Sequence, residues 1–204
     1  YNGNMNKSRP HTVNIIDGAK GMEKETLKLA MAYGSVLDHK DNDIGHFGLG
    51  MKTAATSMGK VLTVLTKHVD GKLVKGVLDL DRVKETQSWV YDFAEPTPKD
   101  ELWFKFKLTQ AGCGTDHGTI VSITKLDNLT VTAKAIISRL SSIENLPRIF
   151  SKTLDNCSIY VGENLIKPKS YDNGVFVNET ISESFPKGWR PLESKSERTK
   201  GWFF

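Results

Sequence analysis

The sequence predicts an α/β fold of two layers, in which a mixed and mostly antiparallel sheet carries helices on one face. Three observations lead to this class. Runs of branched and alternating apolar residues recur along the chain, an Asp-Gly turn joins two of them, and segments with the period of a one-sided helix separate the others. We expect residues 1–155 to form one domain and residues 156–204 to begin a second.

The expected elements begin with a strand and a helix. Branched residues over 11–16 are typical of a strand, and the loop 17–21 follows it. From Glu23 onward apolar residues recur at helical spacing, and Gly34 is expected to end that helix. A polar stretch then leads to a glycine-rich segment.

A second helix and a hairpin are expected next. Residues 51–58 are small or straight-chain and favour a helix. The strands expected over 61–69 and 73–80 flank Asp70-Gly71, a dipeptide typical of tight turns between antiparallel strands. This pairing is the strongest local indication that the sheet is antiparallel.

The remaining elements complete the sheet and open the second domain. Further strands are expected over residues 89–93, 102–108 and 119–124, and a helical period returns over 132–150 with a break at Pro147. After these, the segments 158–161 and 165–166 are expected to pair as a small hairpin.

Composition excludes several classes of protein. The 204 residues carry 28 basic and 24 acidic side chains, spread along the chain, so nucleic acid contact is allowed but not indicated. The two cysteines, Cys113 and Cys157, lie in no CxxC pair, which argues against a zinc site and against a disulfide framework. The sequence has no apolar run long enough to span a membrane, and we expect an intracellular protein, cytoplasmic or, in a eukaryote, nuclear.

Aromatic residues are expected to pack against the sheet, and the candidates are Trp89, Trp103, Phe104 and Phe106. The alternative is that their alternation with Lys105 and Lys107 binds nucleic acid.

The first motif with chemical content is Asp17 at a strand end, followed by Gly18 and Gly21 and then a helix. A carboxylate there can accept a hydrogen bond from the exocyclic amine of adenine, and Gly21 leaves room for a flat base beside the backbone. Asp-Gly turns are common, so an ordinary turn into a helix is the alternative.

The second motif is the segment Gly45-His-Phe-Gly-Leu-Gly50, followed by Met51 and Lys52. Its glycines can wrap an anion, and the amides at the following helix start would face that anion with the positive end of the helix dipole. A flexible loop without a ligand is the alternative. The segment is not a P-loop, because Met51 intervenes before Lys52 and turns the lysine by about 100° around the helix.

The third motif is Gly118-Thr119 at the start of a strand, with Gly114-Thr115 as an alternative pair. In combination and in this order, the three motifs resemble the nucleotide site of the GHKL superfamily, which includes gyrase, the heat-shock chaperones, histidine kinases and MutL. The resemblance is closest to the MORC branch and its prokaryotic relatives. It covers residues 11–125, and more faintly the chain up to Lys169.

The resemblance implies a Bergerat-type sandwich followed by the start of a transducer-like domain. It assigns adenine contacts to Asp17, Gly21, Met22 and Thr119. It places the lid and the phosphate contacts at Gly34, Ser35, Gly45, His46, Phe47, Gly48, Leu49, Gly50, Met51 and Lys52. Ala19 stands where the family has glycine, so the loop is expected to be slightly stiffer.

The resemblance further implies ATP and Mg²⁺ as ligands, ATP-driven self-association, and DNA or a protein as client. In the family, a helix before the first strand supplies a catalytic Glu and a magnesium-binding Asn. We expect this helix to be missing here, because residues 1–16 contain no acidic side chain. No catalytic residue is therefore assigned, and ATP hydrolysis is expected only of the complete protein. The alternatives are a non-hydrolysing nucleotide sensor or scaffold, and a histidine-kinase catalytic domain.

Overall fold

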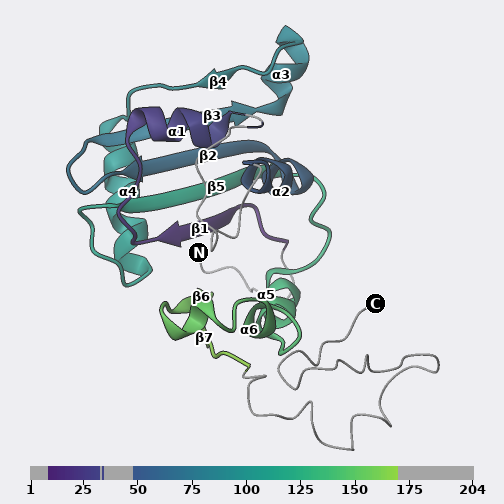
Figure 1. Ribbon diagram of the computed structural model, residues 1–204. Helices are drawn as coiled ribbons and strands as arrows, with labels where there is room; N and C mark the ends of the chain where they lie inside the picture. The colour runs from purple at the N-terminus through teal and green to yellow at the C-terminus, as the bar shows by residue number, and fades with distance from the viewer. Residues whose placement is uncertain (1–8, 33, 35–47, 170–204) are drawn as a thin grey trace, which may run out of the picture. The chain divides into compact units, whose positions relative to one another are not determined.

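The computed structural model describes residues 9–32, 34 and 48–169. The chain divides into two compact units between Ile136 and Ile137, and each unit is a separate body here. The first unit contains a five-stranded sheet, and the second contains a two-stranded one (Figure 1). This division follows the contacts within the chain. The predicted boundary between residues 155 and 156 separates two expected domains of the family, and it stays a prediction.

The five-stranded sheet has the order β1-β5-β2-β3-β4, and every pair of neighbours is antiparallel. Its strands are β1 (Val13–Asp17), β2 (Gly59–Lys67), β3 (Leu73–Asp79), β4 (Tyr91–Asp92) and β5 (Gly118–Leu126). The predicted class, an α/β fold with a mostly antiparallel sheet, is confirmed. The hairpin predicted around Asp70-Gly71 is the β2–β3 pair, in which Lys67 lies opposite Leu73.

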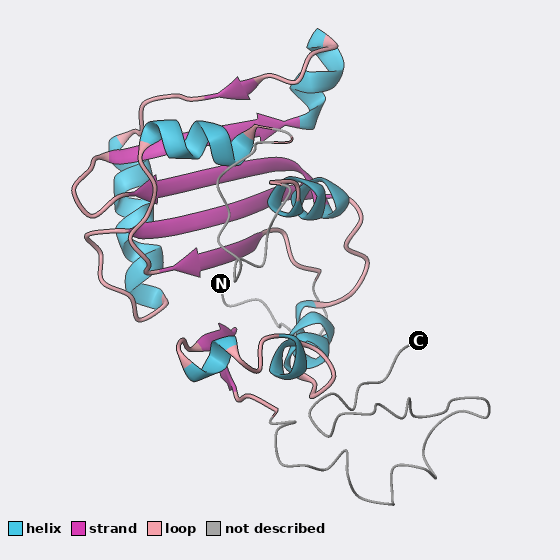
Figure 2. Ribbon diagram, in the orientation of Figure 1, coloured by secondary structure: helices cyan, strands magenta, loops and turns pink. Residues whose placement is uncertain are grey.

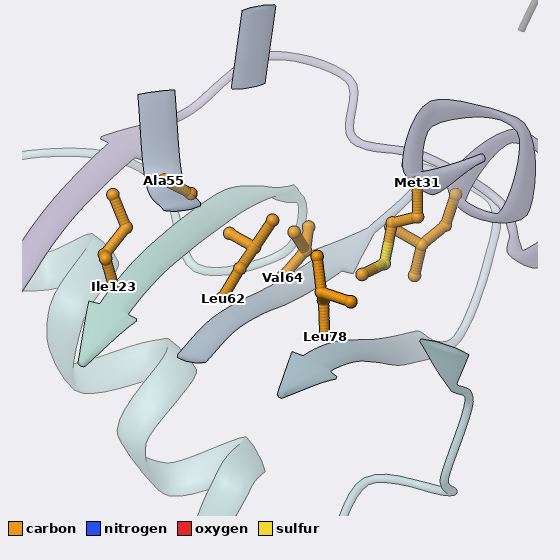
Figure 3. Packing of buried hydrophobic residues seen from close by; sticks show 7 residues of the cluster. Met31, Ala55, Leu62, Val64, Leu78 and Ile123 are labelled. Carbon is orange, nitrogen blue, oxygen red and sulfur yellow. The ribbon is translucent and has the colours of Figure 1, made fainter. Parts of the chain in front are cut away.

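Two helices cover one face of this sheet: α1 (Lys24–Met31) and α2 (Gly50–Met58). Leu27 and Met31 lie one helical turn apart on α1, and both are fully buried. Figure 3 shows the side chains from β2 and β3 that rise toward Met31. The buried core of this face consists of Leu27, Met31, Ala55, Leu62, Val64, Leu78 and Ile123.

Residues 102–108 are not a strand, as the sequence predicts, but part of helix α4 (Pro98–Gln110). Thr97 and Asp100 form a capping box at its start, with Pro98 in the first turn. Phe104 and Leu108, four residues apart, are the buried residues of the helix. The alternation of apolar and charged residues in this stretch is typical of a strand, but the stretch is helical.

α4 adds a helix on the opposite face of the sheet from α1 and α2. Phe104 and Leu108 pack with Leu65 and Ile120, which alternate along β2 and β5 with the residues of the first core. Only part of the aromatic prediction holds, because Phe106 is 61% exposed and Trp89 is 54% exposed. The strand predicted over 89–93 shrinks to the two residues of β4.

The helix α3 (Leu80–Thr86), which the sequence does not predict, follows β3 directly. The Asp79 side chain accepts a hydrogen bond from the Asp81 amide at 2.9 Å and caps the helix. Lys125 of β5 bonds to both carboxylates, at 3.3 Å and 2.9 Å, and ties the helix start to the sheet.

The second unit consists of short elements (Figure 2). The helix predicted over 132–150 is two helices, α5 (Ala133–Ser141), which crosses the unit boundary, and α6 (Leu146–Ile149), with Pro147 in the first turn of α6. A 3₁₀ turn, Thr153–Asp155, leads to the predicted hairpin of β6 (Ile159–Val161) and β7 (Asn164–Ile166). Across the described residues, every helix is too short or too polar to span a bilayer.

Candidate functional site

A row of three polar residues crosses the sheet at one end, with one residue on each of three neighbouring strands. Asp17 of β1 lies opposite Thr119 of β5, and Thr119 lies opposite Thr66 of β2. Residues directly opposite one another point to the same face of a sheet. Because Val64 is two residues from Thr66 and belongs to the core under α1 and α2, the row faces the same side as these helices. Strand pairing thus brings the first and third sequence motifs together.

Thr66 belongs to this row although no sequence motif points to it. Its side chain is 0% exposed, and Thr119 is 7% exposed. The Thr66 hydroxyl oxygen lies 3.0 Å from the Thr119 hydroxyl and 3.1 Å from the Gly118 carbonyl oxygen, to which it donates. It also accepts a hydrogen bond of 2.9 Å from the Met22 amide. The hydroxyl therefore joins the loop after β1 to the start of β5.

The loop between β1 and α1 is held by hydrogen bonds along its length. The Ala19 amide donates to Asp17 Oδ1 at 3.0 Å, and His117 Nδ1 donates to the Ala19 carbonyl at 2.8 Å. The Val69 amide donates to the Lys20 carbonyl at 3.0 Å. The loop is thus attached to the residues just before β5 and just after β2, which fixes where β1 delivers the Asp17 carboxylate.

Gly21 has a structural reason to be glycine that differs from the predicted one. Its φ is +71°, in the left-handed region that other residues rarely adopt. A Cβ on Gly21 would lie 1.9 Å from the Lys67 carbonyl oxygen, so the loop could not approach the end of β2 so closely with any side chain there. The predicted role of Gly21, room for a base, stays a prediction.

The Asp17 carboxyl has a pKa raised above its ordinary value of 3.8. Burial among the surrounding loop and strand is the main cause, and the hydrogen bond from the Ala19 amide opposes it. Asp17 is nevertheless exposed, so water still reaches part of the carboxyl. A partly desolvated acceptor at a strand end is suited to a ligand that carries a hydrogen-bond donor.

The described part of the glycine-rich segment forms the start of α2. Gly48 has a φ of +59°, and Leu49 is the N-cap residue of the helix. Leucine has no side-chain oxygen that could accept from the amides of Met51 and Lys52, so among the described residues the start of α2 lacks the side-chain cap that α4 has. Amides at a helix start with no capping side chain are suited to an anion.

Lys52 occupies a position that the sequence did not predict. Its side chain is 1% exposed, and its ammonium group donates to the carbonyl oxygens of Ala30 at 2.8 Å and Ala32 at 2.7 Å. These carbonyls end α1, where the negative end of the helix dipole favours a cation. Burial lowers the pKa of Lys52. The described contacts therefore attach α2 to the end of α1, and the predicted contact with phosphate stays a prediction.

α1 separates the two halves of the candidate site. Its eight residues span about 12 Å, from the turn at Gly21 and Met22 to the carbonyls held by Lys52. Gly34 is exposed, with a φ of +67°. The other predicted lid and phosphate residues, Ser35, Gly45, His46 and Phe47, lie outside the described residues.

Two cavities lie away from this row of residues. One, of about 370 Å³, is in the second unit between α5 and β7, and the other, of about 590 Å³, lies beside α3. Neither is lined by Asp17, Thr66 or Thr119. The two cavities contain none of the residues of the three motifs, whereas the row contains Asp17 and Thr119 from two of them.

The described part of the chain contains no cluster of side chains that could bind magnesium. Within residues 9–32, 34 and 48–169, no three His, Cys, Asp or Glu side chains gather so that they could hold a metal ion. The predicted Mg²⁺ therefore stays a prediction.

Comparison with known protein families identifies the family of the region that contains this row of residues. Residues 3–119, more than half of the chain, match the family model described as histidine kinase-, DNA gyrase B- and HSP90-like ATPase. A comparison with curated proteins finds no match. The matched region ends at Thr119 and includes Asp17, Thr66 and the whole of α2. The chain therefore belongs to the histidine kinase-, DNA gyrase B- and HSP90-like ATPases, and it contains an ATP-binding domain of that family.

Proposed function

We propose that the chain binds ATP along α1, with the adenine at Asp17 and Thr119 and the phosphates at the start of α2. The observation that carries this proposal is the row formed by Asp17, Thr119 and Thr66. Two separate sequence motifs meet there by strand pairing, on the face that also carries α2.

The chemistry of the two ends matches the two ends of the nucleotide. The Asp17 carboxylate can only accept hydrogen bonds when ionised, and the exocyclic amine of adenine can only donate them. At the other end, the start of α2 offers backbone amides and the positive end of a helix dipole to the phosphates. One bound nucleotide would therefore extend along α1, from Asp17 to the start of α2.

The wider role that we propose is that of a MORC-like ATPase. ATP binding closes a lid beginning near Gly34 and promotes self-association, and this switch acts on DNA or on a protein client. The resemblance of the Asp17–Met22 loop and of the segment 45–53 to the MORC branch supports this role. The family match supports ATP binding and leaves the branch open.

Calorimetric titration with ATP and GTP tests the adenine assignment. We expect the wild-type chain to prefer ATP, and Asp17→Asn to weaken ATP binding about 10- to 100-fold, since a buried hydrogen bond to a charged group contributes about 1.5 to 3 kcal/mol. GTP binding should be kept or strengthened, because guanine has a carbonyl where adenine has the amine, and the amide group introduced by Asp17→Asn can donate to that carbonyl whereas the Asp17 carboxylate cannot.

The matched control is Asp127→Asn, which removes an exposed carboxylate just beyond the other end of β5. It should leave both affinities unchanged. If Asp17→Asn bound ATP and GTP as the wild type does, the assignment of Asp17 to adenine would be wrong.

A further inference from the structure

We propose that Thr66 is a positioning residue for adenine selectivity: its buried hydroxyl fixes the direction of the Thr119 hydroxyl, so that Thr119 presents only hydrogen-bond acceptors to the base. The inference rests on the proposed function, because it takes the base to lie at Asp17 and Thr119. The proposal gives β2 a role in recognising the base, although none of the three sequence motifs lies on β2.

The geometry places one hydroxyl among three polar groups. Thr66 Oγ1 lies 2.9 Å from the Met22 amide, 3.1 Å from the Gly118 carbonyl oxygen and 3.0 Å from Thr119 Oγ1. Since Thr66 is 0% exposed, water cannot take the place of any of these partners. A buried hydroxyl with unmatched partners would be costly, so all three contacts should be satisfied together.

Counting protons fixes the direction of each hydrogen bond. A threonine hydroxyl has one proton and two lone pairs. The Gly118 carbonyl can only accept, so the Thr66 proton points to it, and the Met22 amide can only donate, so it occupies one Thr66 lone pair. Thr119 must then donate its own proton to the second lone pair. This is the arrangement that uses all three contacts.

The consequence for the site is that Thr119 has already used its proton. What its oxygen can offer to a ligand is therefore lone pairs, and the neighbouring Asp17 carboxylate offers lone pairs as well. Two acceptors side by side match the amino group of adenine. They repel the carbonyl oxygen that guanine carries at the same position, because two acceptors cannot share a hydrogen bond.

Removing the Thr66 hydroxyl should change selectivity as well as affinity. In Thr66→Val the Met22 amide loses its acceptor, and the Thr119 hydroxyl is free to turn and donate to a guanine carbonyl. A purely structural role for Thr66 would lower stability and weaken both nucleotides equally. The ratio of the two affinities therefore distinguishes positioning from packing.

The experiment compares Thr66→Val and Thr66→Ser in the 204-residue chain by calorimetric titration with ATP and GTP. We expect Thr66→Val to bind ATP about tenfold more weakly, the loss typical of one unsatisfied buried group. The preference for ATP over GTP should fall several-fold. Thr66→Ser, which keeps the hydroxyl, should stay within about twofold of the wild type in both respects.

The matched control is Thr63→Val, on the same strand but on the opposite face of the sheet. It should leave the selectivity unchanged. If Thr66→Val kept the wild-type ratio of affinities, or if Thr63→Val shifted the ratio as much, Thr66 would have no positioning role.

A readout without nucleotide separates this inference from the proposed function. Amide hydrogen exchange should be about tenfold faster at Met22 in Thr66→Val than in Thr66→Ser, because the amide has lost its buried acceptor. A wild-type chain that preferred ATP, with Asp17→Asn losing that preference and Thr66→Val keeping it, would overturn the role of Thr66 alone. Failure of the wild type to bind ATP would overturn the proposed function.

Should Thr66→Val not fold, Thr119→Val breaks the same hydroxyl pair from the β5 side. It should also weaken ATP binding and lower the preference for ATP. Unchanged selectivity in this variant would equally contradict the inference.

Discussion

Asp17 has a structural cost that fits the binding role proposed for it. Burial raises the pKa of its carboxyl above the ordinary value, because desolvation disfavours the charged form, and the Ala19 amide compensates only in part. A raised carboxyl pKa means that the folded chain takes up this proton more readily than the unfolded chain. At neutral pH the ionised Asp17 therefore works slightly against folding, which is a common property of binding residues.

The raised pKa of Asp17 predicts a pH dependence of ATP binding. Only the ionised carboxylate is purely an acceptor, so ATP affinity should fall as the pH is lowered through the pKa of Asp17. Because that pKa is raised, the fall should begin at a higher pH than for an ordinary aspartate. Titrations over a pH series measure this effect.

Two variants serve as controls for the pH series. Asp127→Asn should show the wild-type profile, whereas Asp17→Asn should bind weakly and lose this pH dependence. Asp17→Asn should also unfold at a urea concentration no lower than the wild type, since it removes a desolvated charge. An identical pH profile in Asp17→Asn and the wild type would show that another group controls the binding.

At the scale of the elements, α4 depends on its capping box. Thr97 Oγ1 accepts from the Asp100 amide at 3.2 Å, and Asp100 Oδ2 accepts from the Thr97 amide at 2.9 Å. Lys75 of β3 donates to the other Asp100 oxygen at 2.9 Å and ties the helix start to the sheet. Although burial opposes them, these hydrogen bonds hold the pKa of Asp100 below its ordinary value.

We expect Thr97→Ala to lower the free energy of unfolding by about 1 kcal/mol, the usual effect of losing an N-cap side chain. Urea denaturation followed by circular dichroism measures the change. The control is Thr130→Ala, at an exposed position outside the helices and strands, which should stay within about 0.5 kcal/mol of the wild type. Equal losses in the two variants would argue against the cap.

The elements that the sequence predicts well are those whose signals are local. Asp70-Gly71 identifies the β2–β3 hairpin, and the spacing of Leu27 and Met31 identifies α1. In α4 the local signals conflict, since residues 102–108 alternate like a strand while Thr97 and Asp100 cap a helix. The cap and the burial of one helical face decide the outcome, and the period-two pattern has no structural counterpart.

In the candidate site, too, only the residues with local signals could be predicted from the sequence. Asp17 and Thr119 could be selected because each lies at a strand end beside glycine, and strand pairing places them opposite one another. Thr66 could not be selected, because its partners Met22 and Thr119 are 44 and 53 residues away and meet it only through the register of β2 and β5. Likewise, the contact of Lys52 with the end of α1 depends on packing between helices.

At the scale of the whole molecule, the described site residues all belong to one compact unit. Asp17, Thr66, Lys52 and Thr119 lie before Ile136, where that unit ends. The family match also ends inside the unit. The described residues of the proposed nucleotide site therefore all lie in this unit, and β6, β7 and α6 contribute none of them.

ATP binding and self-association should be linked if the proposed role is correct. A ligand that favours the dimer must itself be bound more tightly by the dimer, because the coupling free energy is reciprocal. Light scattering should show the mass of the chain rising from 22.7 kDa toward twice that value on addition of a slowly hydrolysed ATP analogue. The apparent ATP affinity should also increase with protein concentration.

Asp17→Asn separates the two parts of this expectation. At analogue concentrations that saturate the wild type, the variant should keep its starting mass, because it binds too little nucleotide to shift the equilibrium. At concentrations high enough to saturate the variant too, its mass should rise as in the wild type, since the role proposed for Asp17 is in nucleotide affinity alone. A wild-type chain that binds the analogue at an unchanged mass would contradict ATP-driven self-association while leaving ATP binding intact.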